Sequence, residues 1–297
     1  MLPRATAGSG QPLPTWARAL APSLPHTAVA LLNLDYMHRA QSPLDPRLRG
    51  MIRWTAAEAN RCQYSQACAL ADLRRAAVSD TTIRALVAGD ESAFSSKEKA
   101  ALSFARKLTL NADAVTDTEV ARLIKEYGEK QVVGMVLLLA YANFQDRLIL
   151  ALDLPLETTG PLPPLELRFK ADLSHQPPQR PPFPNRDAAP PVAERVADPA
   201  WAKVDFEHLQ KALQGQRARK ARIALPDWEK ARKSFPVEYQ SLNKPAVQWS
   251  LVCLGYQPEL TAVWFNAMGA FGAESRQDRV LEESLFWVIT RAINCFY

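Results

Sequence analysis

Apolar positions repeat at helical spacing through the first half of the chain. Residues 131–152 are apolar around nearly the whole helical circumference, which predicts a long buried helix. We also predict a helix over residues 45–76. Because no stretch alternates between apolar and polar residues for long, we predict an all-α fold. A further apolar stripe follows Ser95, at Ala101, Leu102, Phe104, Ala105 and Leu108.

Two capping boxes mark where helices begin. Ser95 and Glu98 stand three residues apart, so each side chain can accept a hydrogen bond from the backbone N–H of the other residue. Thr116 and Glu119 repeat this spacing. The helix behind them is predicted to end at Gly128, a residue type favoured just after the last helical turn.

The prolines divide the chain into parts. About half of the 23 prolines lie between residues 154 and 199, where their missing N–H groups and fixed φ angles prevent regular elements. We therefore predict a helical domain over residues 1–155, a semi-rigid proline-rich linker over residues 156–200, and a second helical unit over residues 201–297.

Composition restricts the class of protein. A hydrophobic fraction of 47% excludes a wholly disordered chain, and a net charge of +5 suits an enzyme as well as a weak binder of anions. The basic residues between positions 214 and 222 lack interleaved aromatic residues, so we expect a solvated helix face and no nucleic-acid partner. Four cysteines in 297 residues do not form a disulfide scaffold and fit a reducing compartment.

No segment indicates a membrane span or a secretory signal. The longest apolar stretch, residues 132–144, is too short to cross a bilayer. The N-terminus has no apolar core behind its first basic residue. We therefore expect a cytoplasmic protein with no membrane partner.

Two stretches of the chain resemble each other at an offset of 233 residues, which indicates a duplicated unit. The matched pairs are Pro12 and Pro245, Trp16 and Trp249, Pro25 and Pro258, Asp45 and Asp278, Leu48 and Leu281, Trp54 and Trp287, and Cys62 and Cys295. Only Phe296 and Tyr297 follow Cys295, whereas a long helical stretch follows Cys62. We therefore expect the second unit to be cut off in its motif helix, with apolar faces that lack partners.

The residues around each cysteine resemble a known motif. Glu283 precedes Cys295 by twelve residues, and Cys295 is followed by Phe296 and Tyr297; the first unit contains Cys62, Tyr64 and Ser65 in the same register. This pattern resembles the carboxymuconolactone decarboxylase and alkyl hydroperoxidase D family, whose motif is a glutamate followed twelve residues later by Cys-x-Tyr-Cys-x-x-x-His. The resemblance covers residues 12–155 and 245–297.

The resemblance implies an all-helical fold assembled into trimers or hexamers, so we expect a homo-oligomer. In the peroxidase branch, the cysteine pair forms a redox disulfide that accepts electrons from a thiol or lipoyl-type donor. The glutamate and the histidine of the motif activate a thiol. General chemistry agrees, because a thiolate is the nucleophile and requires a nearby base. No cofactor is implied beyond the redox partner.

The first unit departs from the motif at three of its four chemical positions. Cys62 occupies the first cysteine position, but Ser65 replaces the second cysteine, Ala69 the histidine and Gly50 the glutamate. Cys68 does not compensate, because six residues along a helix turn it away from Cys62. We interpret Cys62 and Ser65 as a vestigial site, with Cys62 a small buried hydrophobic residue.

The second unit keeps Glu283 and Cys295, which are our candidate catalytic residues. The positions of the partner cysteine and the histidine fall after Tyr297, so the chain as given is expected to be inactive as a disulfide peroxidase. Glu283 is equally well explained as a solvated glutamate on a helix.

The remaining titratable residues form no recognisable site. His38 is expected at a helix end or on the surface, and no cluster has metal-ligand spacing. Three functions stay open. They are a peroxidase-type thiol oxidoreductase with its chemistry in the second unit, a cofactor-free lactone decarboxylase of the same fold, and a non-enzymatic helical scaffold or oligomerisation module.

Overall fold

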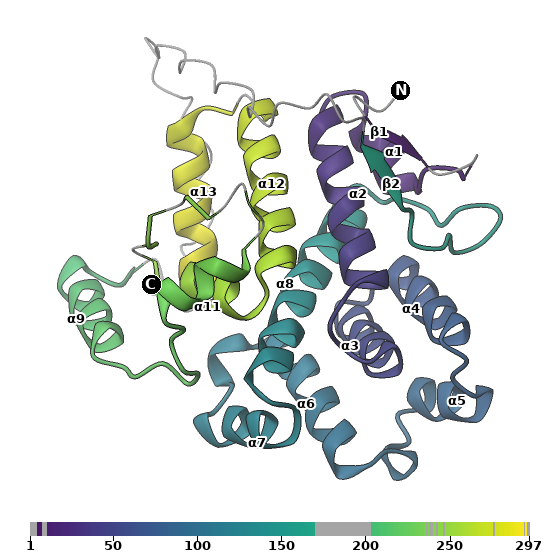
Figure 1. Cartoon of the computed structure of the whole chain (residues 1–297), viewed down its shortest axis with the longest axis horizontal. Helices are drawn as coiled ribbons and strands as arrows, with labels where there is room; N and C mark the ends of the chain where they lie inside the picture. The colour runs from purple at the N-terminus through teal and green to yellow at the C-terminus, as the bar shows by residue number, and fades with distance from the viewer. Residues whose placement is uncertain are drawn as a thin grey trace.

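The protein is all-α apart from one short ribbon (Figure 1). The computed structural model describes residues 5–7, 11–169, 203–235, 237, 240–241, 243–245, 247–275, 277–293 and 295. The first helices are α1 (Thr15–Leu20), α2 (Pro25–Ala40), α3 (Pro46–Ala59), α4 (Gln63–Arg75), α5 (Asp80–Ala88), α6 (Ser96–Leu110), α7 (Asp117–Tyr127) and α8 (Glu129–Ala151). The later ones are α9 (Phe206–Arg217), α10 (Trp228–Ala231), α11 (Gln248–Tyr256), α12 (Pro258–Glu274) and α13 (Arg279–Ala292). Single 3₁₀ turns span Glu91–Ala93, Ala112–Ala114 and Arg232–Ser234.

Helix α8 is the central element, as its apolar sequence predicts. Its side chains enter two core clusters: Met135 and Leu138 pack with α3, α6 and α7, whereas Val133, Leu137 and Tyr141 pack with α1, α2 and α12. Within the described part of the chain, α8 is the one helix long and apolar enough to cross a membrane. Of its most apolar window, 67% is buried inside the protein, as expected for a core helix.

Both predicted capping boxes are present. The Ser95 hydroxyl accepts a hydrogen bond from the Glu98 N–H, and the Glu98 carboxylate accepts one from the Ser95 N–H, at 3.3 and 2.9 Å. Thr116 and Glu119 exchange the same pair of bonds at the start of α7. Helix α7 ends at Gly128, whose φ of 78° favours glycine over other residues.

The prediction of one helix over residues 45–76 is wrong. Helix α3 ends at Ala59, and Arg61 adopts a left-handed φ of 58° that turns the chain. The Cys62 N–H then closes the turn by donating to the Ala57 carbonyl at 2.9 Å. Cys62 is therefore the residue that precedes α4, and it lies at the corner between two packed helices.

The segment after α8 packs against the first helices, although it falls in the predicted linker. Glu157, Leu165 and Leu167 are buried, and strand β2 (Leu167–Phe169) pairs antiparallel with strand β1 (Ala5–Ala7). Strands of three residues are too short for an alternating pattern to predict. Residues 170–202, which include most of the predicted linker, lie outside the described residues.

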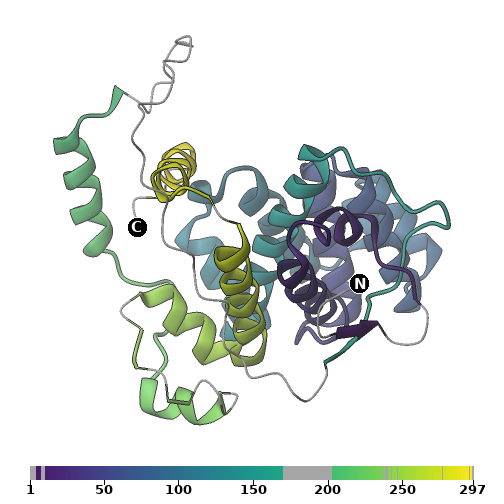
Figure 2. The same ribbon diagram turned by 90° about the horizontal axis from the view of Figure 1, so that it is seen from above.

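Helices α11 and α12 dock on the first helices, with α12 antiparallel to α2 (Figures 1 and 2). The Glu274 carboxylate, at the end of α12, accepts hydrogen bonds from the backbone N–H groups of His26 and Thr27 at 2.8 and 2.7 Å. At the other end of α12, Tyr256 donates to the Glu129 carboxylate at 2.5 Å, and Gln257 donates to the Lys130 carbonyl at 2.7 Å.

Glu274 supplies the cap that α2 lacks locally. The residue that precedes α2 is Leu24, which offers no side-chain acceptor to the first N–H groups of the helix. A carboxylate at a helix N-terminus also interacts favourably with the helix dipole. The docking of α12 therefore stabilises α2 through a specific polar contact as well as through apolar packing.

We expect Glu274→Ala to lower the free energy of unfolding by about 1–2 kcal/mol, because the N–H groups of α2 lose their acceptor. Urea denaturation followed by circular dichroism measures this change. The matched control is Glu259→Ala, which removes an exposed glutamate from the first turn of the same helix. It should change the free energy of unfolding by less than about 0.5 kcal/mol. Equal effects of the two substitutions would contradict the capping role.

Candidate active site at the start of α4

The turn between α3 and α4 brings two of the motif positions together. The Cys62 thiol lies 3.4 Å from the Ser65 hydroxyl, to which it donates a hydrogen bond, and both side chains are buried. Burial raises the pKa of Cys62, and the hydrogen bonds with Ser65 offset this effect only in part. The thiol is therefore held in its neutral form, which is a poor nucleophile.

The other two motif positions hold no titratable group. A Cβ atom at Gly50 would lie 2.6 Å from the Leu73 side chain, so Leu73 fills the space that a larger residue at position 50 would need. Ala69 lies one helical turn beyond Ser65 and contributes only a methyl group to the same region. No base of the motif type is therefore present beside Cys62.

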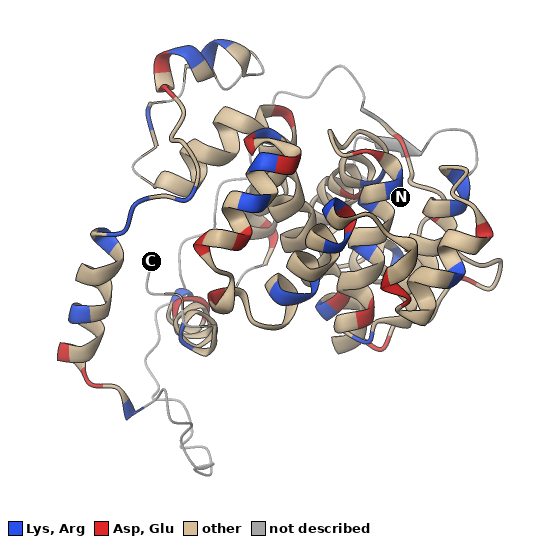
Figure 3. Ribbon diagram, turned by 90° about the horizontal axis from the view of Figure 1, so that it is seen from below, with Lys and Arg blue, Asp and Glu red and all other residues tan. Residues whose placement is uncertain are grey.

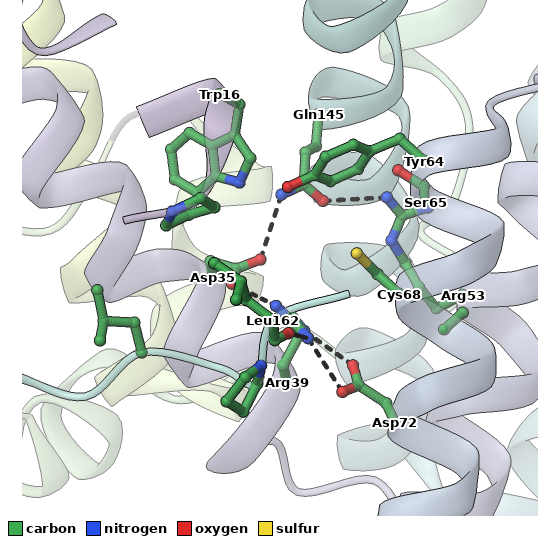
Figure 4. Close-up of a pocket in the computed structure, with 14 residues that line it drawn as sticks. Trp16, Asp35, Arg39, Arg53, Tyr64, Ser65, Cys68, Asp72, Gln145 and Leu162 are labelled. Carbon is green, nitrogen blue, oxygen red and sulfur yellow. Dashed lines mark hydrogen bonds and ion pairs between the residues drawn. The ribbon is translucent and has the colours of Figure 1, made fainter. Parts of the chain in front are cut away.

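A small closed cavity adjoins these residues (Figure 4). Its volume is about 20 Å³, which accommodates one water molecule and no organic substrate. Side chains from α2, α3, α4 and α8 line it, and residues 162–165 close it from outside. The polar residues among them are Asp35, Arg39, Arg53, Tyr64, Ser65, Cys68, Asp72 and Gln145.

Arg39 joins three elements around this cavity. Its guanidinium binds both carboxylate oxygens of Asp72 at 2.8 and 3.0 Å, Asp35 at 3.0 Å, and the carbonyl of Leu162 at 2.9 Å. Asp72 is shared with Arg75. Burial alone would lower the pKa of Arg39, but the two carboxylates outweigh it and raise that pKa. This arrangement fixes the covering segment at Leu162 above α2 and α4.

A second buried ion pair joins α3 to α8. Arg53 contacts Asp146 at 2.5 and 3.2 Å and also donates to Gln145 at 3.0 Å, while Asn60 donates to Asp146 at 2.9 Å. Burial opposes the charge of Arg53, yet the Asp146 carboxylate raises the pKa of Arg53 overall. Because both charges are paired and hydrogen-bonded, their burial is tolerated.

His38 lies in the last turn of α2, as expected, but it is buried and not at the surface. Its ring stacks on Tyr141 with centroids 4.7 Å apart, and the residue is 1% exposed. Burial, together with the charges of Arg53 and Arg49, lowers the pKa of His38 to about 3. Tyr141 donates its hydroxyl proton to Asp35 at 2.9 Å. His38 is thus a neutral core residue, and its ring lies within the apolar and aromatic packing of α2 and α8.

The segment that follows α8, residues 152–169, covers the cavity and is also anchored by the carboxylate of Glu157. Tyr64 donates to Glu157 at 2.6 Å, and the same oxygen accepts the Thr15 N–H at 2.8 Å. Burial, with the Glu157 hydrogen bond, raises the pKa of Tyr64. Contacts to α1, α2 and α4 therefore hold this segment over the cavity.

The two candidate catalytic residues of the second unit lie far apart along α13. Glu283 is exposed on its second turn and pairs with Arg279 at 3.7 Å. Cys295 follows the last turn and is partly exposed. From Glu283 to Ala292, the last residue of α13, the helix rises by roughly 14 Å, so Glu283 lies well before the turn that holds Cys295.

Sequence reasoning missed the buried charged network of α2, α3, α4 and α8. A signal was present, since Asp35 and Asp146 interrupt otherwise apolar helical faces. A charged residue in such a position is stable only when it is paired. Pairing partners from distant helices, however, cannot be assigned from spacing alone.

Lys and Arg are interspersed with Asp and Glu over the described ribbon (Figure 3). The basic residues Arg217, Arg219 and Lys220 are exposed at and just beyond the end of α9, and Arg222 pairs with Asp117 at 2.7 Å. Within the described ranges, no group of three His, Cys, Asp or Glu side chains is arranged to hold a metal ion.

The fold and the site define a helical-bundle domain with a buried cysteine directly before a half-buried helix. Residues 25–107 match the model of the carboxymuconolactone decarboxylase family, and this part of the chain is similar to that family. The matched range runs from the first residue of α2 into α6 and contains Cys62 and Ser65. No curated protein and no solved structure shows a significant match to the chain.

The burial of the thiols predicts their reactivity. At pH 8 we expect iodoacetamide to label Cys295 faster than Cys62, Cys68 or Cys253, as measured by peptide mass spectrometry. Burial raises the pKa of Cys68 to about 12 and that of Cys253 to about 11. Labelling of these two thiols should therefore rise about tenfold per pH unit between pH 8 and 10. Equal labelling of Cys62 and Cys295 at pH 8 would contradict this assignment.

Proposed function

We propose that the protein is a peroxidase-type thiol oxidoreductase whose chemistry resides at Cys295 and uses an external thiol in place of the partner cysteine of the motif, while the first unit is catalytically silent. One observation carries this proposal. The Cys62 N–H donates to the carbonyl of Ala57 at 2.9 Å, and the Cys295 N–H donates to the carbonyl of Thr290 at 2.8 Å. Both donors and acceptors are related by the offset of 233 residues, so Cys295 takes the backbone position of Cys62.

The helices that lead to the two cysteines agree with this equivalence. Helices α2 and α12 both begin with a proline in the first turn, at Pro25 and Pro258. Helices α3 and α13 both begin behind an aspartate cap, at Asp45 and Asp278. These paired boundaries support a second unit built like the first, with Glu283 at the position of Gly50.

The proposed reaction requires no group outside the chain except a peroxide and a thiol reductant. The Cys295 thiolate attacks the terminal peroxide oxygen, a sulfur–oxygen bond forms, and the oxygen–oxygen bond breaks. The leaving alkoxide takes up a proton to give an alcohol. A thiol donor then attacks the sulfenic acid, releases water and leaves a mixed disulfide, which a second thiol reduces. A role of Glu283 in proton transfer stays a prediction, because its carboxylate is exposed on the second turn of α13 and pairs with Arg279.

The first unit suits a supporting role in this account. Its cysteine is neutral and buried, its cavity has a volume of only about 20 Å³, and its α2 and α8 form the surface on which α11 and α12 dock. These contacts favour a scaffold function for the first unit, which would support the second unit while that unit carries the thiol chemistry. A cofactor-free lactone decarboxylase, assembly into a homo-oligomer and a cytoplasmic location stay predictions.

Peroxide treatment of the chain tests the proposal. After one equivalent of an alkyl hydroperoxide, we expect a sulfenic acid at Cys295, trapped by a dimedone-type reagent and located by peptide mass spectrometry. Cys295→Ser should abolish the trapped adduct and the matching loss of peroxide. Cys62→Ala is the matched control and should leave both unchanged.

Two outcomes would overturn the assignment. Peroxide loss that persists in Cys295→Ser would place the chemistry elsewhere in the chain. A trapped sulfenic acid at Cys62, in an amount equal to the peroxide lost, would show that the first unit carries the activity. In contrast, the lactone decarboxylase alternative predicts a lactone-consuming activity that Cys295→Ser leaves intact.

A further inference from the structure

An apolar groove of about 390 Å³ lies where α2, α8 and α12 meet. Helices α2 and α12 run side by side (Figures 1 and 2), and residues of α8 and of the turn before α2 complete the walls. Of the described residues, none lines both this groove and the cavity beside Ser65. A concave, apolar space of this volume is typical of a site for a small organic molecule.

The groove has a buried floor and a partly exposed rim. Leu31, Leu34 and Ala267 form the floor and are 7, 0 and 5% exposed. Met268 and Phe271 stand at the rim and are 52 and 40% exposed. A ligand in the groove would remove these large apolar rim side chains from water, and the hydrophobic effect favours its binding in proportion to the area buried.

The shape of the groove is long and narrow. On α2 the lining runs from Thr27 to Leu34, and on α12 it runs from Trp264 to Phe271, each roughly 10 Å along its helix. The turn before α2 extends the lining further at one end, where Leu20 and Leu24 contribute. The groove therefore fits an extended chain of atoms better than a compact ring system.

The polar groups at the groove are few. Apart from the indole of Trp264, Thr27 is the one polar side chain among the described residues that line it, and none of these residues is charged. The Thr27 hydroxyl donates to the Glu274 carboxylate at 2.7 Å, so the Thr27 oxygen can only accept a further hydrogen bond. The neighbouring carboxylate of Glu274 also disfavours a second negative charge at this end. The lining therefore selects a ligand that is uncharged and carries a hydrogen-bond donor.

We propose that this groove binds an uncharged aliphatic chain that ends in a hydroxyl group, such as a medium-chain alcohol. The chain lies along α2 and α12 over Leu31 and Leu34, and its hydroxyl donates to the oxygen of Thr27. Met268 closes over the chain, because its unbranched side chain adapts to irregular apolar surfaces. The inference goes beyond the thiol chemistry proposed for Cys295 and does not depend on it.

A helix of another protein does not fit this groove. Its floor is formed by α2 and α12, which pack against each other, and packed helices lie only about 8–10 Å apart. A third helix, about 10 Å across, would touch the rim alone and leave the floor empty. An alkyl chain is narrow enough to reach Leu34 and Ala267.

Fluorescence of phenylnaphthylamine, an uncharged apolar probe, tests the inference on the full chain. We expect its emission to rise on binding with one probe per chain, and n-decanol to displace it. Decanoate at neutral pH, which has the same chain length and a negative charge, should displace it at least about tenfold less well, since the groove offers no partner for a carboxylate.

Two variants locate the binding. Met268→Glu places a charge at the rim and Ala267→Leu fills the floor, and each should weaken the binding of n-decanol at least about tenfold. The matched control is Leu110→Glu, which changes an exposed apolar residue at the end of α6 and should leave binding unchanged. Because Met268 is half-exposed, Met268→Glu is expected to fold and keeps the test decisive if Ala267→Leu does not.

Three outcomes would overturn the inference. Probe binding that both Met268→Glu and Leu110→Glu leave unchanged would place the site elsewhere, and equal displacement by decanoate and n-decanol would contradict the selection against charge. Probe binding that weakens as the protein concentration rises would assign the groove to a second copy of the chain. None of these readouts uses peroxide or Cys295, so a failure of the proposed function is distinguishable.

Discussion

Helix α8 has an apolar surface around its whole circumference, and the rest of the structure depends on covering it. Helices from the first unit cover most of this surface, and α11 covers the part near its N-terminal end. Burial of apolar area contributes roughly 25 cal/mol per Å², so an uncovered α8 would be strongly unfavourable. The docking of α11 and α12 on the first helices follows from this requirement, and the hydrogen bonds of Glu274 and Tyr256 fix its register.

The same burial determines the character of the site. Charged groups that face α8 are stable only in pairs, and the Arg53–Asp146 and Arg39–Asp72 pairs meet this condition. They fill the region beside Cys62 and Ser65 with fully engaged side chains. Packing and ion pairs therefore occupy this region of the first helices, and the motif positions Gly50 and Ala69 carry no titratable group.

The sequence predicts the elements whose signals are local. Ser95 with Glu98 and Thr116 with Glu119 identify helix starts because a capping box needs only neighbouring residues. The break before Cys62 was missed, since Arg61 carries no sequence preference for a left-handed turn. His38 and the charged network were also missed, because their environment is set by helices far apart in sequence. The family match confirms the recognition of the domain, whereas Glu283 and Cys295 stay predictions.

The most direct test asks whether positions 62 and 65 have the geometry of the cysteine pair in the motif. With Ser65→Cys, a second thiol would stand where the Ser65 hydroxyl now lies 3.4 Å from the Cys62 sulfur. Mild oxidation followed by mass spectrometry should then show a loss of two hydrogens and a disulfide, within one chain, between Cys62 and the thiol introduced at position 65. Two free thiols after oxidation, in a folded variant, would contradict the equivalence of positions 62 and 65 with the cysteine pair of the motif.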